Sequence, residues 1–156
     1  MIKIPIHVLT VNWTDFDGEE PAEMLEIPDT AEMRFPGVVT YHLRAQLVNS
    51  GVLVEGRVAT KIAAQCGRCL TEFEREIVNA EVCHFYEDPA KDMLDVTDDV
   101  REDMVLAIPC NPVCGENCKG LCPDCGVNLN EKDCGCRVTR NNPGVWKDLD
   151  NLKFEK

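Results

Sequence analysis

Serine is nearly absent from this sequence, and its single copy, Ser50, precedes a glycine in a turn-like segment. A serine nucleophile activated by histidine and aspartate is therefore not expected. Glycine-rich loops that hold nucleotide phosphates are also missing. The three histidines, His7, His42 and His84, lie in strand-like segments, where a hydrogen-bonded structural imidazole is the favoured interpretation. These absences leave few candidates for catalysis, and we expect a protein that is not an enzyme.

Long hydrophobic runs are missing as well. The N-terminal run is interrupted by Pro5 and His7 before it is long enough for a signal-peptide core, and no stretch approaches the roughly 20 apolar residues of a membrane span. We therefore expect a cytoplasmic protein without membrane partners. In a reducing cytoplasm the ten cysteines remain thiols, so metal binding or redox chemistry is their expected use.

Lysine and arginine are scarce relative to aspartate and glutamate, 16 against 28, and the formal net charge is -12. A protein that wraps nucleic acid needs the opposite surplus. Residues 1–65 hold 5 basic and 9 acidic groups, residues 66–109 hold 4 and 12, and residues 110–156 hold 7 of each. Only the last segment would meet an RNA phosphate without net repulsion. Its candidate contacts are Lys119, Lys132, Arg137, Arg140 and Lys147.

Apolar residues alternate with polar ones through much of the first half of the chain, which predicts β-strands. We expect a first strand over residues 1–11, a loop with at most short structure over residues 12–32 and an antiparallel meander over residues 38–85. The meander turns at residues 49–51, and residues 66–69 form the tip of its second hairpin.

The third strand of this meander opens with Phe73 and Ile77, and its apolar phase then shifts by one residue to Val78, Ala80 and Val82. A shift of this kind predicts a β-bulge. Cys83, which stands alone in the same strand, is expected to belong to the core.

A helix is predicted to begin near Asp95 or Thr97 and to end at about Ile108. Its apolar residues form one stripe, which consists of Val96, Val100, Met104, Ala107 and Ile108. A second short helix is suggested over residues 145–152. The predicted fold class is α+β, mainly an antiparallel meander or barrel-like sheet with one or two short helices and a small C-terminal zinc-ribbon-like module. The expected division is a β-rich domain over residues 1–109 and a metal-binding tail over residues 110–156.

Cysteine is the residue that the C-terminal third has in excess. Seven thiols occur at Cys110, Cys114, Cys118, Cys122, Cys125, Cys134 and Cys136. In the segment Cys122-Pro123-Asp124-Cys125-Gly126, the spacing lets both sulfurs reach one ion about 2.3 Å away, and the glycine permits a tight turn. A short hairpin and a second ligand pair would complete a zinc ribbon.

The preferred ligands are Cys122 and Cys125, followed by Cys134 and Cys136. Cys114 and Cys118 could replace the latter pair, because a C-x3-C spacing also clamps an ion, whereas Cys110 is the spare thiol. Four cysteines close the coordination shell, which indicates a structural rather than a catalytic metal. Zinc is the expected ion, and an iron-sulfur cluster is the alternative that accepts the same ligands.

A second motif, Cys66-Gly67-Arg68-Cys69, lies at the hairpin tip. It could supply ligands to the same site, although the interval to Cys122 exceeds the usual spacing of a ribbon. A structural turn with two thiols and an interaction site are the other interpretations. A thioredoxin-type role is disfavoured, because that motif begins a helix in a βαβ unit.

These motifs together resemble the bacterial YceD family, described as large ribosomal RNA subunit accumulation proteins. The resemblance rests on Cys66-Gly67-Arg68-Cys69-Leu70, on the run from Cys114 through Cys118-Lys119-Gly120-Leu121-Cys122-Pro123-Asp124-Cys125-Gly126-Val127-Asn128-Leu129-Asn130, on Cys134-Gly135-Cys136, and on the closing Asn142-Pro143 to Trp146-Lys147-Asp148-Leu149. It spans roughly residues 38 to 153. Some family members keep the hairpin motif but lack the C-terminal cysteines. The resemblance therefore implies that a shared partner-binding function lies at Cys66, Arg68 and Cys69.

The resemblance implies a non-enzymatic factor that supports the accumulation, processing or stability of large-subunit ribosomal RNA during ribosome biogenesis. The acidity suggests that basic ribosomal or assembly proteins are its partners, while the C-terminal tail could touch the RNA.

Two alternatives remain open. One is an iron-sulfur or thiol redox protein, and the other is a metal-dependent nuclease acting on ribosomal RNA precursors. The nuclease would use the acidic neighbours Asp95, Asp98, Asp99, Glu102 and Asp103, for which a solvated helix face is the favoured interpretation.

Overall fold

The computed structural model describes residues 1–89 and 92–136. The chain divides into two compact units. Unit 1 contains Met1–Gly67 and Thr71–Glu116, and unit 2 contains Arg68–Leu70 together with the chain from Asn117 onward. None of the helices in the described ranges combines the length and the hydropathy that a bilayer crossing requires.

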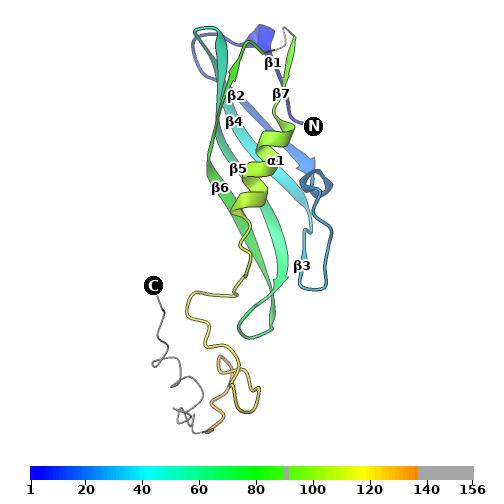
Figure 1. The fold of residues 1–156 in the computed structure, drawn as a ribbon, viewed down its shortest axis with the longest axis vertical. Coiled ribbons are helices and arrows are strands. Elements are labelled where there is room, and N and C mark those ends of the chain that lie inside the picture. The colour runs from blue at the N-terminus through cyan, green and yellow to red at the C-terminus, as the bar shows by residue number, and fades with distance from the viewer. Residues whose placement is uncertain (90–91, 137–156) are drawn as a thin grey trace, which may run out of the picture. The chain divides into compact units, whose positions relative to one another are not determined.

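Unit 1 is built on a five-stranded antiparallel sheet whose central strand is β5 (Figure 1). Its strands are β2 (Thr14–Pro21), β3 (Met33–Arg34), β4 (Val38–Val48), β5 (Gly51–Gln65) and β6 (Glu72–Glu87). The hydrogen-bonded order is β2-β4-β5-β3, and β6 also pairs with β5. Two further short strands, β1 (Lys3–Pro5) and β7 (Met93–Asp95), pair with each other. The predicted class, a mainly antiparallel β fold with a short helix, is confirmed.

The sheet buries one face, as its alternating sequence predicts. On β5, Val52, Val54, Val58 and Ile62 are buried, with relative exposures of 1% or less. The helix α1 (Thr97–Ala107) packs against β5, β6 and the 3-10 helix η2 (Ala22–Leu25). Its buried residues Val100 and Met104 complete this core, on the apolar stripe that the sequence predicts.

A β-bulge interrupts the pairing of β5 with β6. Gly56 lies opposite Val82 and Val58 lies opposite Asn79, so that two residues of β6, Ala80 and Glu81, face the single Arg57. The bulge explains why Ile77 and Val82 are both buried despite their odd separation. The predicted bulge is therefore present, but it lies at Ala80 and Glu81 and not directly after Ile77, so that Val78 and Ala80 are exposed.

Two predictions about the N-terminal segment are wrong. The first strand does not extend over residues 1–11, because Pro5 ends β1 and the chain continues as a 3-10 helix, η1 (Ile6–Val8). Residues 12–32 are not a loop, because β2 lies within them and pairs with β4 along its whole length. The polar sequence of β2 carries little apolar alternation, since this strand forms the edge of the sheet.

The helix prediction is close to the observed element. The carboxylate of Asp95 accepts a hydrogen bond from the backbone N–H of Thr97 at 3.0 Å, while Val96 is the N-cap residue. This hydrogen bonding, led by the Thr97 side chain, lowers the pKa of Asp95. The helix predicted over residues 145–152 lies outside the described residues.

Candidate metal centres

Eight of the ten cysteines gather into two groups of four. In each group, the four sulfur atoms lie within 4.8 Å of one another. The first cysteine group contains Cys66, Cys69, Cys114 and Cys118, and the second cysteine group contains Cys122, Cys125, Cys134 and Cys136. A tetrahedral zinc site with Zn–S bonds of about 2.3 Å places its sulfurs about 3.8 Å apart. Both groups therefore have spacings that one ion can span.

The second cysteine group is built on a tight turn and a short hairpin, both within unit 2. The backbone N–H of Gly126 donates to the carbonyl of Cys122 at 2.9 Å, and the N–H of Cys122 donates to the carbonyl of Val127 at 2.8 Å. Gly126 has a left-handed backbone, with φ of 74°. An isolated β-bridge between Leu121 and Asn128 continues the hairpin. This arrangement is the local structure that the CPDCG sequence predicts.

Hydrogen bonds within the second cysteine group shift the pKa values of Cys122, Cys134 and Cys136. The pKa of Cys122 falls to about 7, because the backbone N–H groups of Cys125 and Asp124 and the thiol of Cys134 hydrogen-bond to its sulfur. The pKa of Cys136 rises to about 12, because the sulfurs of Cys125 and Cys134 hold its proton. The backbone of Cys136 lowers the pKa of Cys134, but the Cys122 hydrogen bond and burial produce a net rise. A cation that replaces these protons would relieve the competition among sulfurs.

The first cysteine group draws on the tip of the β5–β6 hairpin. Cys66 and Cys69 are buried, with relative exposures of 0% and 5%. The backbone N–H of Cys66 donates to the carbonyl of Thr71 at 2.9 Å and closes the tip. The neighbouring Gly67 donates its N–H to the carbonyl of Pro112 at 2.9 Å, which holds the segment that leads to Cys114. The position of residues 66–69 at the hairpin tip agrees with the sequence prediction.

Within unit 2, Arg68 has two structural contacts. Its Nη1 donates to the carbonyl of Cys118 at 3.3 Å, and its own carbonyl accepts the N–H of Leu121 at 3.1 Å. These contacts hold the segment between the two cysteine groups beside the hairpin tip. Arg68 thus supports the local structure around the sulfur of Cys118.

The sequence did not reveal how the cysteines divide. It placed Cys114 and Cys118 as substitutes within a single site and left open whether Cys66 and Cys69 join that site. The structure instead assembles two complete sets of four sulfurs, and Cys110 belongs to neither. Six thiols remain when the CPDCG turn and the final pair form one site. Two of them, Cys83 and Cys110, were set aside by the sequence analysis, so the other four could have been recognised as a second set. The long interval between Cys69 and Cys114 concealed it.

Comparison with known proteins identifies the family. The family model described as "Large ribosomal RNA subunit accumulation protein YceD" matches residues 84–153. An uncharacterized protein of Mycobacterium tuberculosis is 31% identical over 138 residues, which cover 72% of this chain and 67% of the relative. The chain belongs to the YceD family.

Two plant relatives carry the same description. The maize protein named "Large ribosomal RNA subunit accumulation protein YCED homolog 1, chloroplastic" is 37% identical over 79 residues, which cover 49% of this chain and 26% of the maize protein. Its Arabidopsis thaliana counterpart is 33% identical over 60 residues, which cover 38% of this chain and 18% of that protein. No solved structure matches this YceD chain.

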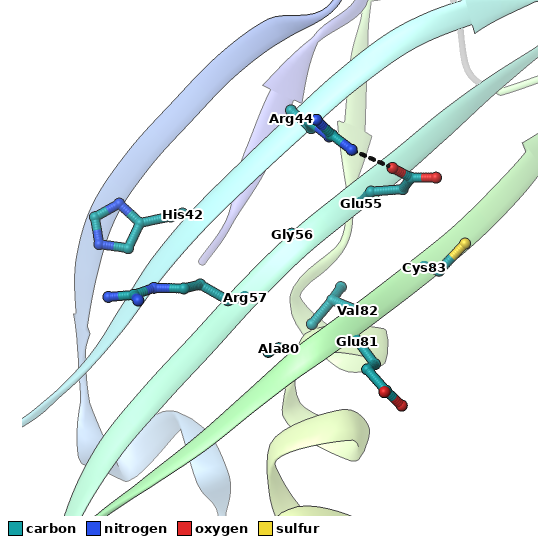
Figure 2. Close-up of a pocket in the computed structure, with 9 residues that line it drawn as sticks. All are labelled: His42, Arg44, Glu55, Gly56, Arg57, Ala80, Glu81, Val82 and Cys83. Atoms are coloured by element: carbon teal, nitrogen blue, oxygen red, sulfur yellow. Dashed lines mark hydrogen bonds and ion pairs between the residues drawn. The ribbon is translucent and has the colours of Figure 1, made fainter.

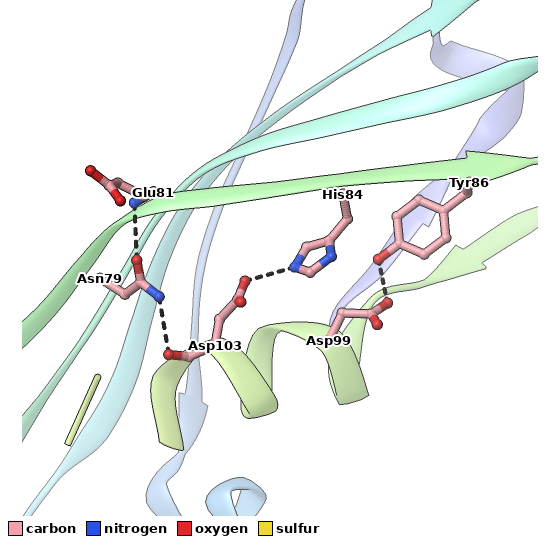
Figure 3. Close-up of polar contacts among 6 residues, drawn as sticks. All are labelled: Asn79, Glu81, His84, Tyr86, Asp99 and Asp103. Atoms are coloured by element: carbon pink, nitrogen blue, oxygen red, sulfur yellow. Dashed lines mark hydrogen bonds and ion pairs between the residues drawn. The ribbon is translucent and has the colours of Figure 1, made fainter. Parts of the chain in front are cut away.

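Two of the carboxylates considered for a nuclease, Asp99 and Asp103, are engaged in contacts between helix and sheet (Figure 3). Asp103 accepts a hydrogen bond from the ring of His84 at 2.7 Å, and Asp99 accepts one from the hydroxyl of Tyr86. Burial and this hydrogen bond raise the pKa of Tyr86. The amide of Asn79 donates to the backbone carbonyl of Asp103 at 3.0 Å. In this member of the YceD family, these side chains attach α1 to β6.

A hollow of about 510 Å³ lies over the bulge, on the sheet (Figure 2). Its lining residues are His42, Arg44, Glu55, Gly56, Arg57, Ala80, Glu81, Val82 and Cys83. Arg44 pairs with Glu55 at 2.9 Å, and its guanidinium lies 4.5 Å from the centre of the Trp13 ring. The prediction that Cys83 belongs to the core is wrong, because this residue is exposed. The bulge reverses the phase of β6, so that Val82 points inward and Cys83 outward.

Proposed function

We propose that this protein is a non-enzymatic factor that supports the accumulation, processing or stability of large-subunit ribosomal RNA, and that structural zinc organises its cysteine-rich part. The observation that carries the proposal is the coincidence of YceD family membership with two groups of four sulfurs. Four thiolates around one zinc leave no open position for a reacting water, so such a site would support the fold and not chemistry.

Zinc is preferred as the bound ion for both cysteine groups. Tetrahedral thiolate coordination suits zinc, and the turns formed by the two C-x2-C motifs are the usual support for it. A reducing compartment keeps cysteines as thiols that are available to bind metal, and we propose the cytoplasm. Between residues 110 and 136, the described part of the cysteine-rich segment, few apolar residues are buried, and bound metal would compensate for this small core. Residues 110–156 are accordingly proposed to be a metal-binding tail, with Cys66 and Cys69 supplying two further ligands to the first site.

The exposed charges of unit 1 favour basic partners. Along β6 the exposed side chains include five glutamates and one arginine, namely Glu72, Glu74, Glu76, Glu81, Glu87 and Arg75. On α1, Asp98 and Glu102 are exposed as well. Complementary charge accelerates association and selects partners, so these surfaces suit a basic ribosomal or assembly protein. The balanced charge of residues 110–156 allows this segment to touch ribosomal RNA.

The hairpin tip remains the proposed partner-binding element, formed by Cys66, Arg68 and Cys69. It presents Leu70, whose side chain is 54% exposed although it is a large apolar residue. An exposed apolar side chain beside a guanidinium offers a small contact surface to a protein partner. Metal bound at the first cysteine group would hold this tip rigid.

The decisive experiment measures the level of large-subunit ribosomal RNA in cells depleted of the protein. Rescue would be attempted with the wild type, with a Cys66→Ala/Cys69→Ala variant and with a Cys122→Ala/Cys125→Ala variant. Cys83→Ala is the matched control, because Cys83 is exposed and belongs to neither group. We expect depletion to lower the RNA level, and the wild type and the control to restore it. An unchanged RNA level after depletion would refute the proposed function.

Metal content separates this proposal from the redox alternative. Protein purified without added metal and without oxygen is expected to be colourless and to carry two zinc ions per chain. A brown protein with visible absorbance from an iron-sulfur cluster would favour the redox alternative.

Salt-sensitive binding to a basic assembly protein would support the partner assignment, whereas tight binding to bare ribosomal RNA fragments alone would contradict it.

A further inference from the structure

A side-chain amide in unit 2 donates to one of the clustered sulfurs. Nδ2 of Asn130 lies 3.3 Å from the sulfur of Cys118. Cys118 belongs to the first cysteine group, whereas Asn130 lies on the hairpin that forms the second. Hydrogen bonds to a sulfur stabilise its charged thiolate form, which is the form that binds metal.

The orientation of the Asn130 amide is determined by its other neighbours. Its Oδ1 accepts the backbone N–H of Lys119 at 2.8 Å, and its Nδ2 also donates to Oδ1 of Asn128 at 2.8 Å. If the amide were flipped, its NH2 group would face the N–H of Lys119, so that two donors would meet. Its oxygen would then face the sulfur of Cys118. The network therefore requires the N–H to face the sulfur.

The position of Asn130 depends in turn on the turn that carries the second cysteine group. The N–H of Leu129 donates to the carbonyl of Gly120 at 2.9 Å, and the N–H of Cys122 donates to the carbonyl of Val127. The N–H of Asn130 donates to Oδ1 of Asn128 at 3.0 Å. Metal held by the second cysteine group would fix this hairpin and hence the amide.

We propose that Asn130 is a positioning residue that couples the two cysteine groups, so that metal at the second group strengthens metal binding at the first through the N–H to the Cys118 sulfur. This inference rests on the proposed metal sites. Thermodynamic linkage makes the effect reciprocal, so metal at the first group strengthens binding at the second by the same factor. Removal of a hydrogen-bond partner of a metal ligand lowers metal affinity by about 10- to 100-fold.

The test uses Co²⁺ as the probe, titrated into the full metal-free chain against a competing chelator and followed by thiolate-to-cobalt absorbance. Asn130→Asp keeps the size of the side chain and its acceptor for Lys119 but removes the N–H. Asn117→Asp is the matched control, because it adds the same charge beside Cys118 at an exposed position. We expect Asn130→Asp to weaken one of two sites about 10-fold or more, and the control to have a much smaller effect. The charge-transfer band of that site should also move to longer wavelength, because the sulfur loses its hydrogen bond.

Two further variants identify the affected site. In a Cys66→Ser/Cys69→Ser background, which retains only the second group, Asn130→Asp should leave the remaining affinity unchanged. In a Cys122→Ser/Cys125→Ser protein, the first group should bind Co²⁺ more weakly than in the wild type. If the wild type binds two ions but Asn130→Asp behaves like Asn117→Asp, the coupling is refuted while the metal sites stand. A wild type that binds fewer than two ions would overturn the proposed sites themselves and the coupling with them.

Discussion

Leu70 and Gly126 occupy the same position in two separate turns: each residue directly follows the second cysteine of a C-x2-C motif, and each has a left-handed backbone, with φ of 60° and 74°. Two different sequences thus adopt the same local conformation beside two groups of sulfurs. Glycine takes this conformation freely, whereas an L-residue with a side chain pays about 1–2 kcal/mol. The hairpin tip therefore carries strain that the CPDCG turn avoids.

The left-handed backbone at Gly126 predicts the effect of adding a side chain there. No atom lies within 4 Å of a Cβ at this position, so Gly126→Ala changes only the backbone energy. We expect a loss of about 1 kcal/mol, which corresponds to roughly fivefold weaker Zn²⁺ binding at the second cysteine group. Gly115→Ala is the control, because that site is equally open and has no positive φ. Chelator competition measures both, and equal affinities for the two variants would contradict the strain argument.

At the hairpin tip, the opposite substitution, from a residue with a side chain to glycine, is expected to have the opposite effect. Leu70→Gly should remove the strain, and because the side chain is more than half exposed, little buried area is lost. Zn²⁺ binding at the first cysteine group should be unchanged or stronger, while any partner that contacts this leucine should bind more weakly. Weaker Zn²⁺ binding by Leu70→Gly would show that the side chain supports the metal site directly.

At Gly56 the neighbouring strand β4 approaches β5 so closely that there is no room for a methyl group. A Cβ on Gly56 would lie 2.2 Å from the backbone oxygen of His42 and 2.8 Å from the Cα of Leu43. Because both atoms belong to the neighbouring strand, the sheet must move to accept Gly56→Ala, and we expect a loss of about 1–3 kcal/mol of unfolding free energy. Urea denaturation followed by circular dichroism would measure it. Stability equal to that of the wild type would rule out this close approach.

Helix α1 provides a matched pair of core and surface substitutions. Met104 is fully buried, and its truncation to alanine should cost about 2–5 kcal/mol. Leu106, on the same helix, is 77% exposed, and Leu106→Ala should change stability by less than about 0.5 kcal/mol. Urea denaturation of the two variants compares them directly. Similar losses for both would mean that the helix packs in another orientation.

Asp95 predicts a specific loss of stability in acid. Its pKa is lowered in the folded protein by hydrogen bonds from Thr97, so the carboxylate stabilises the fold at pH values above its unfolded pKa of about 3.9. This contribution disappears as the pH falls through the lower folded value. The difference in unfolding free energy between the wild type and Asp95→Asn should therefore shrink as the pH drops from 6 to 3. A difference that stays constant over this range would exclude the linkage.

The spacing of apolar residues predicted those parts of the fold in which buried side chains recur at a regular interval along the chain. The meander of β4, β5 and β6, the bulge and the stripe of α1 were predicted because their inward positions are apolar. The edge strand β2 was missed because its sequence is polar, and backbone pairing with β4 forms it. Cys83 was wrongly predicted to be buried, because the bulge at Ala80 and Glu81 turns its side chain to the exposed face of β6.

The sequence by itself determined the local chemistry: the two C-x2-C turns, the excess of thiols and the uneven charge, all of which depend on residues close together in the chain. Only the tertiary structure decided how the thiols are distributed. Cys66 and Cys69 lie far from Cys114 and Cys118 in the sequence, and spacing rules do not reach across the intervening β6, β7 and α1. The same holds for Asn130 and Cys118, because a side-chain amide meets a particular sulfur only after the hairpin has closed.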